Sequence, residues 1–253
     1  MTKILAHRGA NRICPENTMS AFKKAYECNA DGYESDVFVL HDLTPVIHHD
    51  FLLGRCENVG GNIYDYRREN IQSFSVGEKY AQEFAFERIP LFEDLLKYMQ
   101  EKDLFFLIEM KSDVRQECPF IKYQEDIVLP LIKRYGFEDR CAFVSLNHQM
   151  LLRLKSKYPE AKISMLYLYD HEMDVIDYTL KNGFDIFTLR RDEMTKENVE
   201  KLHSLNLEVS TWPQNNPEMI RNCLDWGIDY LVTDDIETAM RVKNEWLLER
   251  GGK

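Results

Sequence analysis

The sequence has no long apolar run and no stretch rich in glycine or proline. None of its apolar runs approaches the roughly 18 residues typical of a membrane-spanning helix. The N-terminal apolar run ends after three residues, at His7, which is too short for the apolar region of a signal peptide. The chain has only 11 glycines and 8 prolines in 253 residues, a composition that argues against fibrous and disordered proteins. We expect a globular cytoplasmic protein without membrane insertion.

The cysteines and the charge exclude further classes. Zinc-finger and redox motifs need closely spaced cysteines, but the six cysteines are scattered without a C-x-x-C pair, and we interpret them as reduced thiols that mostly fill the core: Cys14, Cys28, Cys56, Cys118, Cys141 and Cys223. The formal net charge of −11 opposes binding to nucleic acid or to an anionic membrane surface. A phosphate-ester substrate would therefore need local positive charge, from a cation and a few placed arginines or lysines. The oligomeric state is not indicated.

Strand-like and helix-like segments alternate along the whole chain. Eight short apolar runs have strand length: 4–7, 33–40, 104–110, 142–146, 162–166, 185–189, 208–211 and 230–232. Segments with apolar residues at helical spacing separate them: 17–28, 92–101, 124–135, 149–158, 172–182, 195–205, 217–226 and 236–248. Asn17 and Thr195 stand where helix N-caps are expected. Eight such units predict a TIM (β/α)8 barrel, with residues 1–253 forming a single domain.

One connection is much longer than the others. About fifty residues separate the second predicted strand from the helix that begins near Phe92. We define residues 50–90 as the excursion; it contains the aromatic residues Phe74, Tyr80, Phe84 and Phe86. Long insertions at one end of a barrel form either functional loops or packed decorations, and the sequence leaves both open.

Carboxylates interrupt two of the predicted strands. Glu34 and Asp36 are two residues apart among apolar neighbours, so both point to one face of the second strand. Glu109 and Lys111 end the third strand in the same way, where a TIM barrel places functional groups. Two adjacent carboxylates repel, so we expect a cation or Arg/Lys side chains to neutralise them; hard oxygen ligands of this kind suit Mg²⁺ or Ca²⁺. The alternative for Glu109 and Lys111 is a structural ion pair at the rim of the barrel.

Histidines occupy corresponding positions at two other strand ends. His7 and Arg8 close the first strand, and His48 and His49 end a short extended run that begins at Val46. Neighbouring residues of an extended segment point to opposite faces, so spacing alone does not choose between His48 and His49. Each histidine taken singly is more often a structural polar residue, but the clustering at strand ends favours a site.

The motifs carrying these residues resemble the glycerophosphodiester phosphodiesterase family, in its cytoplasmic bacterial form. In chain order they are Ala6–Gly9, Pro15–Thr18, Ala21–Phe22, Gly32–Val37, Pro45–Asp50, Ile89–Leu91 and Glu109–Lys111, followed more weakly by Val209–Trp212 and Gly227–Asp234. The resemblance therefore spans essentially the whole chain.

The resemblance implies a TIM barrel that hydrolyses glycerophosphodiesters to glycerol 3-phosphate and an alcohol with one divalent cation, Mg²⁺ or Ca²⁺. It implies these roles: Glu34, Asp36 and Glu109 as metal ligands, His7 and His49 as the acid/base pair, and Arg8 and Lys111 as phosphate contacts. It also selects His49 over His48. The implied partner is a small-molecule substrate.

Two segments depart from the family pattern. Asp42-Leu43 stands where the family usually has an Asp-Gly turn, so we expect a reshaped turn there. Pro213-Gln214-Asn215 follows Trp212, where the family typically continues Thr-Val-Asn. Both changes leave the ligands and histidines intact. They bear on substrate choice, because Trp212 is expected to wall the glycerol or alcohol pocket.

Arg190 and Arg191 follow the sixth predicted strand and are a separate hypothesis. An arginine at the barrel mouth could bind an anionic head group with two hydrogen bonds. The alternative is a solvated loop charge, which is the commoner state of a surface arginine.

Three alternatives to the phosphodiesterase follow from a barrel with this site. A barrel phospholipase acting on intact lipids would need an apolar rim or basic surface, which the acidic net charge disfavours. A non-catalytic binding module would be expected to lack a ligand or a histidine, and none is missing. A sugar-phosphate isomerase would not need three carboxylates and two histidines at strand ends.

Overall fold

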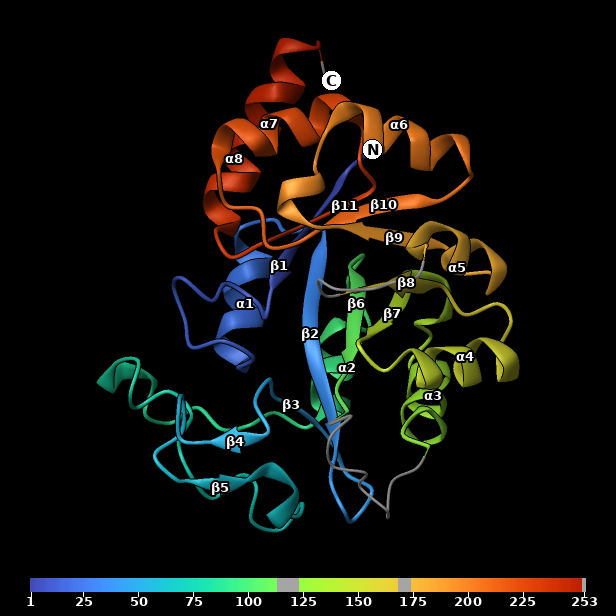
Figure 1. The fold of residues 1–253 in the computed structure, drawn as a ribbon. Coiled ribbons are helices and arrows are strands. Elements are labelled where there is room, and N and C mark those ends of the chain that lie inside the picture. The colour runs from blue at the N-terminus through green and yellow to red at the C-terminus, as the bar shows by residue number, and fades with distance from the viewer. Residues whose placement is uncertain (113–122, 168–173, 252–253) are drawn as a thin grey trace.

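A closed barrel of eight parallel strands forms the centre of the molecule (Figure 1). The computed structural model describes residues 1–112, 123–167 and 174–251. The barrel strands are β1 (Lys3–His7), β2 (Gly32–Val39), β6 (Phe105–Met110), β7 (Cys141–Ser145), β8 (Ile163–Met165), β9 (Ile186–Leu189), β10 (Glu208–Thr211) and β11 (Tyr230–Thr233). Because β1 pairs in parallel with both β2 and β11, the sheet closes on itself. The predicted TIM barrel is confirmed.

Helices follow the strands and surround the barrel (Figure 1). They are α1 (Met19–Glu27), α2 (Phe92–Met99), α3 (Glu125–Arg134), α4 (His148–Lys157), α5 (Val175–Lys181), α6 (Lys196–Ser204), α7 (Pro217–Trp226) and α8 (Ile236–Glu249), with short 3₁₀ turns η3 (Glu138–Arg140) and η4 (Arg191–Glu193). Every predicted barrel strand is found within one residue of its expected bounds. The expected start of α5 and Cys118 lie outside the described residues.

The first helix begins one residue later than its expected cap. Thr18, with an extended backbone, accepts a hydrogen bond from the backbone N–H of Ala21 and is the N-cap of α1. Asn17 has φ +55°, and its side chain binds Ser35 and Asp36 instead. The prediction of Asn17 as N-cap was wrong, because its side chain forms hydrogen bonds with Ser35 and Asp36 of β2 and not with the first turn of α1. The Thr195 cap of α6 is confirmed.

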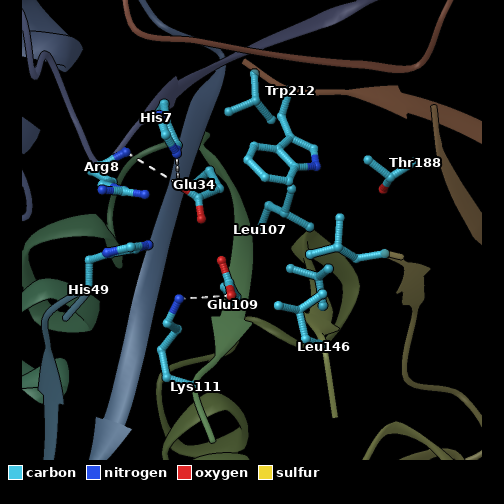
Figure 2. Close-up of a pocket in the computed structure, with 13 residues that line it drawn as sticks. His7, Arg8, Glu34, His49, Leu107, Glu109, Lys111, Leu146, Thr188 and Trp212 are labelled. Atoms are coloured by element: carbon cyan, nitrogen blue, oxygen red, sulfur yellow. Dashed lines mark hydrogen bonds and ion pairs between the residues drawn. The ribbon is translucent and has the colours of Figure 1, made fainter. Parts of the chain in front are cut away.

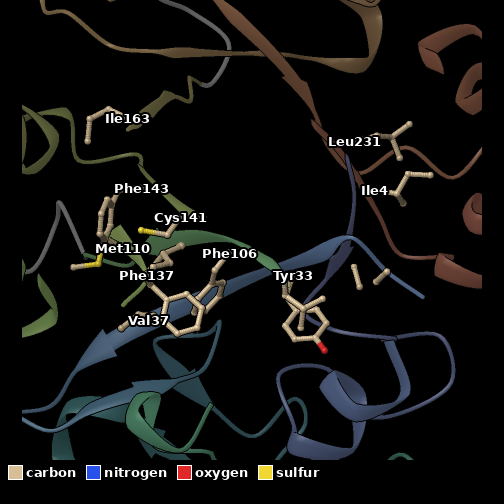
Figure 3. Packing of buried hydrophobic residues seen from close by; sticks show 14 of the residues in the cluster. Ile4, Tyr33, Val37, Phe106, Met110, Phe137, Cys141, Phe143, Ile163 and Leu231 are labelled. Carbon is tan, nitrogen blue, oxygen red and sulfur yellow. The ribbon is translucent and has the colours of Figure 1, made fainter. Parts of the chain in front are cut away.

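Apolar side chains fill both the inside and the outside of the barrel. The inside cluster comprises Leu5, Phe105, Leu107, Ala142, Val144, Leu166, Ile186, Tyr230 and Val232. The larger cluster lies between the strands and the helices, and Figure 3 shows part of it, including Phe106, Phe143 and Ile163. The five described cysteines are free thiols, and four of them lie in buried or apolar surroundings: Cys14, Cys28, Cys141 and Cys223.

Between β2 and α2 the chain forms a small separate layer on one side of the barrel (Figure 1). Its elements are β3 (Pro45–Ile47), which pairs antiparallel with β2, the ribbon β4 (Leu52–Leu53) and β5 (Gly61–Asn62), and the 3₁₀ turns η1 (Ile63–Asp65) and η2 (Gln82–Phe84). Phe38, Ile63 and Phe74 belong to its own apolar cluster, which continues from the end of β2. This arrangement places the excursion beside the carboxyl end of β2.

The turn before β3 keeps a conformation that suits glycine. Leu43 has φ +65° and an exposed side chain, and its N–H donates to the carbonyl of Leu40. Leu43 therefore adopts a backbone conformation that favours glycine, the residue usual in the family at this position. A non-glycine residue in the left-handed region costs roughly 1 kcal/mol, and the contacts of the surrounding turn offset this cost.

Candidate active site

Three carboxylates from two neighbouring strands meet at the carboxyl end of the barrel. The β2–β6 register places Asp36 opposite Glu109, and Glu34 shares the face of Asp36. One oxygen from each of the three carboxylates lies within 4.8 Å of the other two. Glu34 and Asp36 are buried and Glu109 is partly buried. The predicted cluster of carboxylates is therefore formed by the fold.

The electrostatics of this cluster indicate that it requires positive charge. Burial, together with Asp36 and Glu109, raises the pKa of the Glu34 carboxyl well above its usual range. Burial also raises the pKa of Glu109, and Asp36 adds to the effect. For Asp36 burial acts in the same direction, but Lys111 and Arg8 outweigh it, and the pKa of Asp36 is lowered.

Two cationic side chains stand beside the carboxylates. Lys111 Nζ lies 3.0 Å from Glu109 Oε1 and 3.4 Å from Asp36 Oδ1, and Arg8 Nε lies 3.3 Å from Asp36 Oδ2. With three carboxylates and two cations, the cluster keeps an excess of negative charge when all groups are ionised. Asp36 Oδ1 is buried and accepts no hydrogen bond from the described residues. Three features of this cluster fit a divalent cation: its hard oxygen donors, its excess negative charge and a buried carboxylate oxygen that accepts no hydrogen bond from the described residues.

The turn after β1 holds Arg8 in place. Arg8 has φ +55° and donates its backbone N–H to the carbonyl of Glu34, and Gly9 follows with φ +78°. A Cβ on Gly9 would stand 2.7 Å from the backbone carbon of Ala21 in α1, so only glycine fits against that helix. A non-glycine residue in the left-handed region is uncommon and is often found where a site demands it.

Each of the two histidines of the cavity contacts a carboxylate through Nδ1. His7 Nδ1 lies 2.6 Å from Asp234 Oδ1, and His49 Nδ1 lies 2.7 Å from Asp50 Oδ1. Because an ionised carboxylate only accepts hydrogen bonds, these contacts require the proton on Nδ1 and leave Nε2 for other partners. Hydrogen bonds from His7, Asn11 and Asn215 outweigh burial and lower the pKa of Asp234.

His48 lies apart from this arrangement. Its ring is buried, with Nε2 3.6 Å from Oε1 of the fully buried Glu57. Burial lowers the pKa of His48, although Glu57 opposes the effect. Of the two candidate histidines, His49 lines the cavity together with His7.

One cavity brings these groups together (Figure 2). Its volume is about 120 Å³. The polar wall is formed by His7, Arg8, Glu34, His49, Glu109 and Lys111. The opposite wall is mostly apolar and is formed by Leu107, Val144, Leu146, Leu166, Thr188, Trp212 and Val232. Such a cavity suits a ligand with one charged end and one less polar face.

The sequence matches the profile of the glycerophosphoryl diester phosphodiesterase family over residues 7–238. The chain belongs to this family. The expected enzyme class, a phosphoric diester hydrolase of the glycerophosphodiester phosphodiesterase type, is thereby confirmed.

Curated members of the family match along their whole length. A glycerophosphodiester phosphodiesterase of Caldanaerobacter subterraneus subsp. tengcongensis is 30% identical over 256 residues, which cover 99% of both chains. Another, from Bacillus altitudinis, is 30% identical over 97% of this chain and 99% of its own.

Solved structures of the family share the fold. A glycerophosphodiester phosphodiesterase from Agrobacterium tumefaciens superimposes with a TM-score of 0.82 at 22% identity, covering 95% of this chain and 100% of its own. A phosphodiesterase from Oleispira antarctica, in complex with the product sn-glycerol-3-phosphate, gives a TM-score of 0.86 at 19% identity over 96% and 97% of the two chains. At these identities the similarity concerns the fold.

In this family member, Arg190 and Arg191 follow β9 and contact other protein groups. Arg190 pairs with Asp192 and Glu193, and its guanidinium lies 5.2 Å from the ring centre of Tyr167. Arg191 donates from Nε to the carbonyl of Pro213. Neither arginine lines the cavity, as far as the described part of the chain shows.

Our sequence analysis missed the groups that hold the site residues. Asp234 and Asp50 contact the histidines, Asn17 donates to Asp36 Oδ2 at 2.9 Å, and Glu16 and Arg55 pair with one another at 2.6 Å. Asp50 was available as the neighbour of His49, and Asp234 as the polar residue after the last strand. Glu16 and Asn17 belong to the Pro15–Thr18 motif, which marked their segment but not their partners, and Arg55 lies outside every motif.

Proposed function

We propose that this enzyme hydrolyses glycerophosphodiesters to glycerol 3-phosphate and an alcohol, with one divalent cation, Mg²⁺ or Ca²⁺, held by Glu34, Asp36 and Glu109. The observation that carries the proposal is a cluster of three carboxylates, two of which line a cavity together with two carboxylate-bound histidines. When bound, the cation supplies positive charge that stabilises the negative charge developing on the phosphate in the transition state.

His7 and His49 then serve as the acid/base pair. With Nδ1 held by Asp234 or Asp50, each ring directs Nε2 to proton transfer. One histidine takes the proton of the attacking oxygen, which belongs to the glycerol 2-hydroxyl or to water, and the other protonates the leaving alkoxide. If the 2-hydroxyl attacks, the first product is a five-membered cyclic phosphate, which water then opens to glycerol 3-phosphate. Arg8 and Lys111 contact the phosphate and offset its charge.

The two walls of the cavity support a glycerophosphate end as the bound part of the substrate. The phosphate faces the polar wall, and the glycerol carbons or the alcohol pack against the apolar wall, with Trp212 at its rim; 37% of that residue is exposed. The product bound in the Oleispira antarctica structure, sn-glycerol-3-phosphate, supports this class of ligand. Replacing Trp212 with alanine should raise KM more than it lowers kcat.

A head-group contact by Arg190 and Arg191 stays a prediction. Both are engaged by protein groups at present, so an anionic head group would have to compete with them. Unchanged relative activity on anionic and choline-bearing diesters after each Arg→Ala substitution would remove this idea.

The phospholipase alternative receives less support. A cavity of about 120 Å³ is small beside the 300–1,000 Å³ that larger ligands occupy. A separate finding is that no helix among the described residues is long and apolar enough to cross a membrane. Activity on liposomes would favour the phospholipase. We also propose that residues 1–253 act as one domain in the cytoplasm, and that the partner is a small molecule and not nucleic acid.

One assay tests the function directly. Release of glycerol 3-phosphate is measured from a panel of head groups, with Mg²⁺, with Ca²⁺ and with chelator. We expect release that chelator abolishes and either cation restores. With a natural alkyl leaving group, His49→Ala should lose about 10²-fold or more in kcat, since acid/base catalysis contributes about that much. Full activity of His49→Ala, or release unaffected by chelator, would contradict the proposal.

A further inference from the structure

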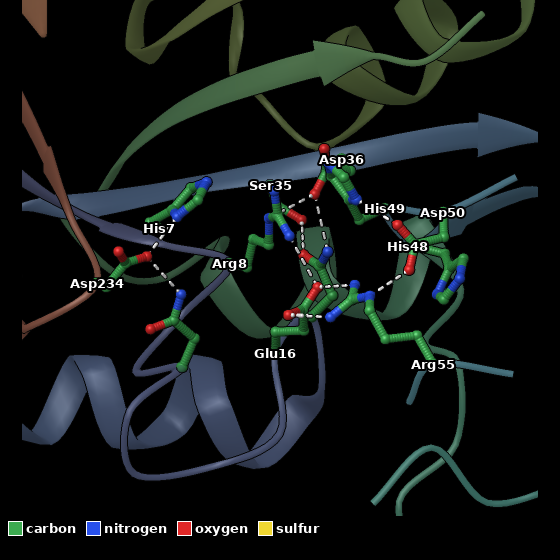
Figure 4. A network of polar contacts seen from close by, with 12 residues as sticks. His7, Arg8, Glu16, Ser35, Asp36, His48, His49, Asp50, Arg55 and Asp234 are labelled. Carbon is green, nitrogen blue, oxygen red and sulfur yellow. Dashed lines mark hydrogen bonds and ion pairs between the residues drawn. The ribbon is translucent and has the colours of Figure 1, made fainter. Parts of the chain in front are cut away.

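A continuous chain of ion pairs connects Arg8 with His49 (Figure 4). Arg8 Nη1 lies 2.9 Å from Glu16 Oε1, and the two terminal nitrogens of Arg55 lie 2.8 and 2.6 Å from the Glu16 oxygens. Arg55 Nε lies 2.5 Å from Asp50 Oδ2, and Asp50 Oδ1 receives the Nδ1 proton of His49 at 2.7 Å. The excursion contributes two links of this chain, Asp50 and Arg55.

Arg55 uses its whole guanidinium in this chain. The two terminal nitrogens bind one carboxylate and Nε binds a second, which matches the fixed geometry of the arginine fork. A lysine donates from a single nitrogen and cannot reproduce the paired bonds to Glu16 together with the bond to Asp50. The geometry therefore depends on arginine and not only on positive charge.

The two carboxylates that bind the histidines are each held by other groups. Asp234 accepts from Asn11 at 2.8 Å and from Asn215 at 2.7 Å in addition to His7. Asp50 has one oxygen on His49 and the other on Arg55. Arg55 thus does for Asp50 what the two asparagines do for Asp234.

We propose that Arg55 is a positioning residue for the reaction: it fixes the Asp50 carboxylate that orients His49, and joins this pair through Glu16 to Arg8. The inference rests on the proposed function of His49 and Arg8. It gives residues 50–57 of the excursion a role in the active site, since nothing else described in that layer reaches Asp50 Oδ2.

The backbone around Arg55 is held by one buried and one exposed side chain, Glu57 and Lys79. The N–H of Gly54 donates to Glu57 Oε2 at 2.7 Å, and Lys79 Nζ donates to the carbonyl of Gly54. Glu57 is fully buried and faces His48, the neighbour of His49. The same short loop therefore contacts the segment of His49 twice, once through Glu57 and once through Arg55.

An ordinary surface ion pair is the competing explanation. The side chain of Arg55 is 48% exposed, and exposed pairs usually contribute little to stability. Its two partners are more enclosed, however, at 19% for Glu16 and 23% for Asp50. If these ion pairs have no role in the reaction, removing Arg55 changes neither kcat nor the orientation and hydrogen bonding of the His49 ring.

Arg55→Ala and Arg55→Lys test the inference in the full chain with saturating Mg²⁺. Groups that orient a functional side chain typically contribute 10- to 100-fold. We expect Arg55→Ala to lower kcat for glycerol 3-phosphate release by about that factor, and Arg55→Lys to recover only part of it. Arg67→Ala replaces an exposed arginine of the same excursion and should match the wild type. Thermal melting establishes that each variant is folded.

Double variants separate positioning from general weakening. If Arg55 acts through Asp50, Arg55→Ala should lower kcat less than twofold in an Asp50→Asn background. In an Asp234→Asn background, where the other histidine is affected, it should keep its full effect. A full multiplicative loss on top of Asp50→Asn would overturn the proposal.

A spectroscopic measurement makes the test independent of activity. In ¹⁵N NMR spectra, Arg55→Ala should shift the ring nitrogens of His49 and leave those of His7 in place. An unchanged His49 ring together with kcat within twofold of the wild type would overturn the inference, as would the failure of both Arg55 variants to fold. A wild-type enzyme that releases no glycerol 3-phosphate would instead refute the proposed function, while the His49 spectra would still decide the role of Arg55.

Discussion

His7 Nδ1 and Asp234 Oδ1 lie 2.6 Å apart, although 227 positions separate the two residues in the sequence. The contact exists because β1 and β11 are neighbours in the closed barrel, with Ala6 paired to Thr233. His7 and Asp234 then follow directly at the ends of these strands. Barrel closure thus supplies the carboxylate that orients His7.

Asp234→Asn should lower kcat for glycerol 3-phosphate release by about 10²-fold or more, because an amide no longer fixes the Nδ1–H tautomer of His7. KM should change little. Steady-state kinetics with saturating Mg²⁺ measure both constants. Asp235→Asn is the neighbouring control, since that residue caps α8 instead; equal losses in the two variants would contradict a specific role of Asp234.

The same substitution should reveal a pH-dependent share of stability. The pKa of Asp234 is lowered in the folded state, so its ionised form stabilises the fold above the ordinary aspartate pKa of about 3.9. This contribution disappears as the pH falls through the folded-state pKa. The difference in free energy of unfolding between wild type and Asp234→Asn should be largest near pH 7 and shrink below about pH 4. Urea unfolding between pH 3 and 7 with chelator measures it, and a constant difference would refute the assignment.

Glu34→Gln should stabilise the metal-free enzyme and remove its response to metal. The raised pKa of Glu34 means that its ionisation opposes folding as the pH rises, and glutamine does not ionise. At pH 8 with chelator we expect a melting temperature a few degrees above wild type. At 100 times its Kd, a cation should stabilise the wild type by about 2.7 kcal/mol and the variant much less. Exposed Glu101→Gln is the control; a destabilised Glu34→Gln protein in chelator would be the contrary result.

Asn17→Ala should weaken cation binding by about 10- to 100-fold, because Asn17 orients the Asp36 carboxylate. The Mg²⁺ concentration giving half-maximal activity measures the effect. Asn29→Ala is a matched control: Asn29 also has a positive φ but is exposed at the end of α1. Both variants should lose some stability from backbone strain, and only Asn17→Ala should need more Mg²⁺. An equal Mg²⁺ requirement in both variants would show that Asn17 acts only on the backbone.

Local periodicity accounts for the parts of the site that could be predicted. Glu34 and Asp36 share a face because side chains alternate along a strand, and the apolar strand around them makes their burial foreseeable. Glu109 stands opposite Asp36 only because β2 and β6 pair in a particular register. That register depends on packing between segments seventy residues apart, which no local pattern encodes.

The excursion could be predicted only in part from local sequence patterns. Its length and aromatic content were evident, but its alternatives, a functional loop or a packed layer, could not be separated. The structure contains features of both: an apolar cluster around Phe38 and Ile63, and Arg55 against Asp50 and Glu16. The contact of Arg55 with Glu16 spans 39 residues and depends on the excursion meeting the loop between β1 and α1.

By itself, the sequence determined the alternation of strands and helices, the barrel that follows from it, and the residue types gathered at strand ends, because period, burial and chain length are local properties. Family motifs added the choice of His49 over His48. Only the tertiary structure decided which carboxylate holds each histidine, that Asn17 serves Asp36 instead of capping α1, and that Arg55 closes the chain of ion pairs. These are contacts between side chains far apart in sequence, and their geometry depends on how the closed barrel packs its loops.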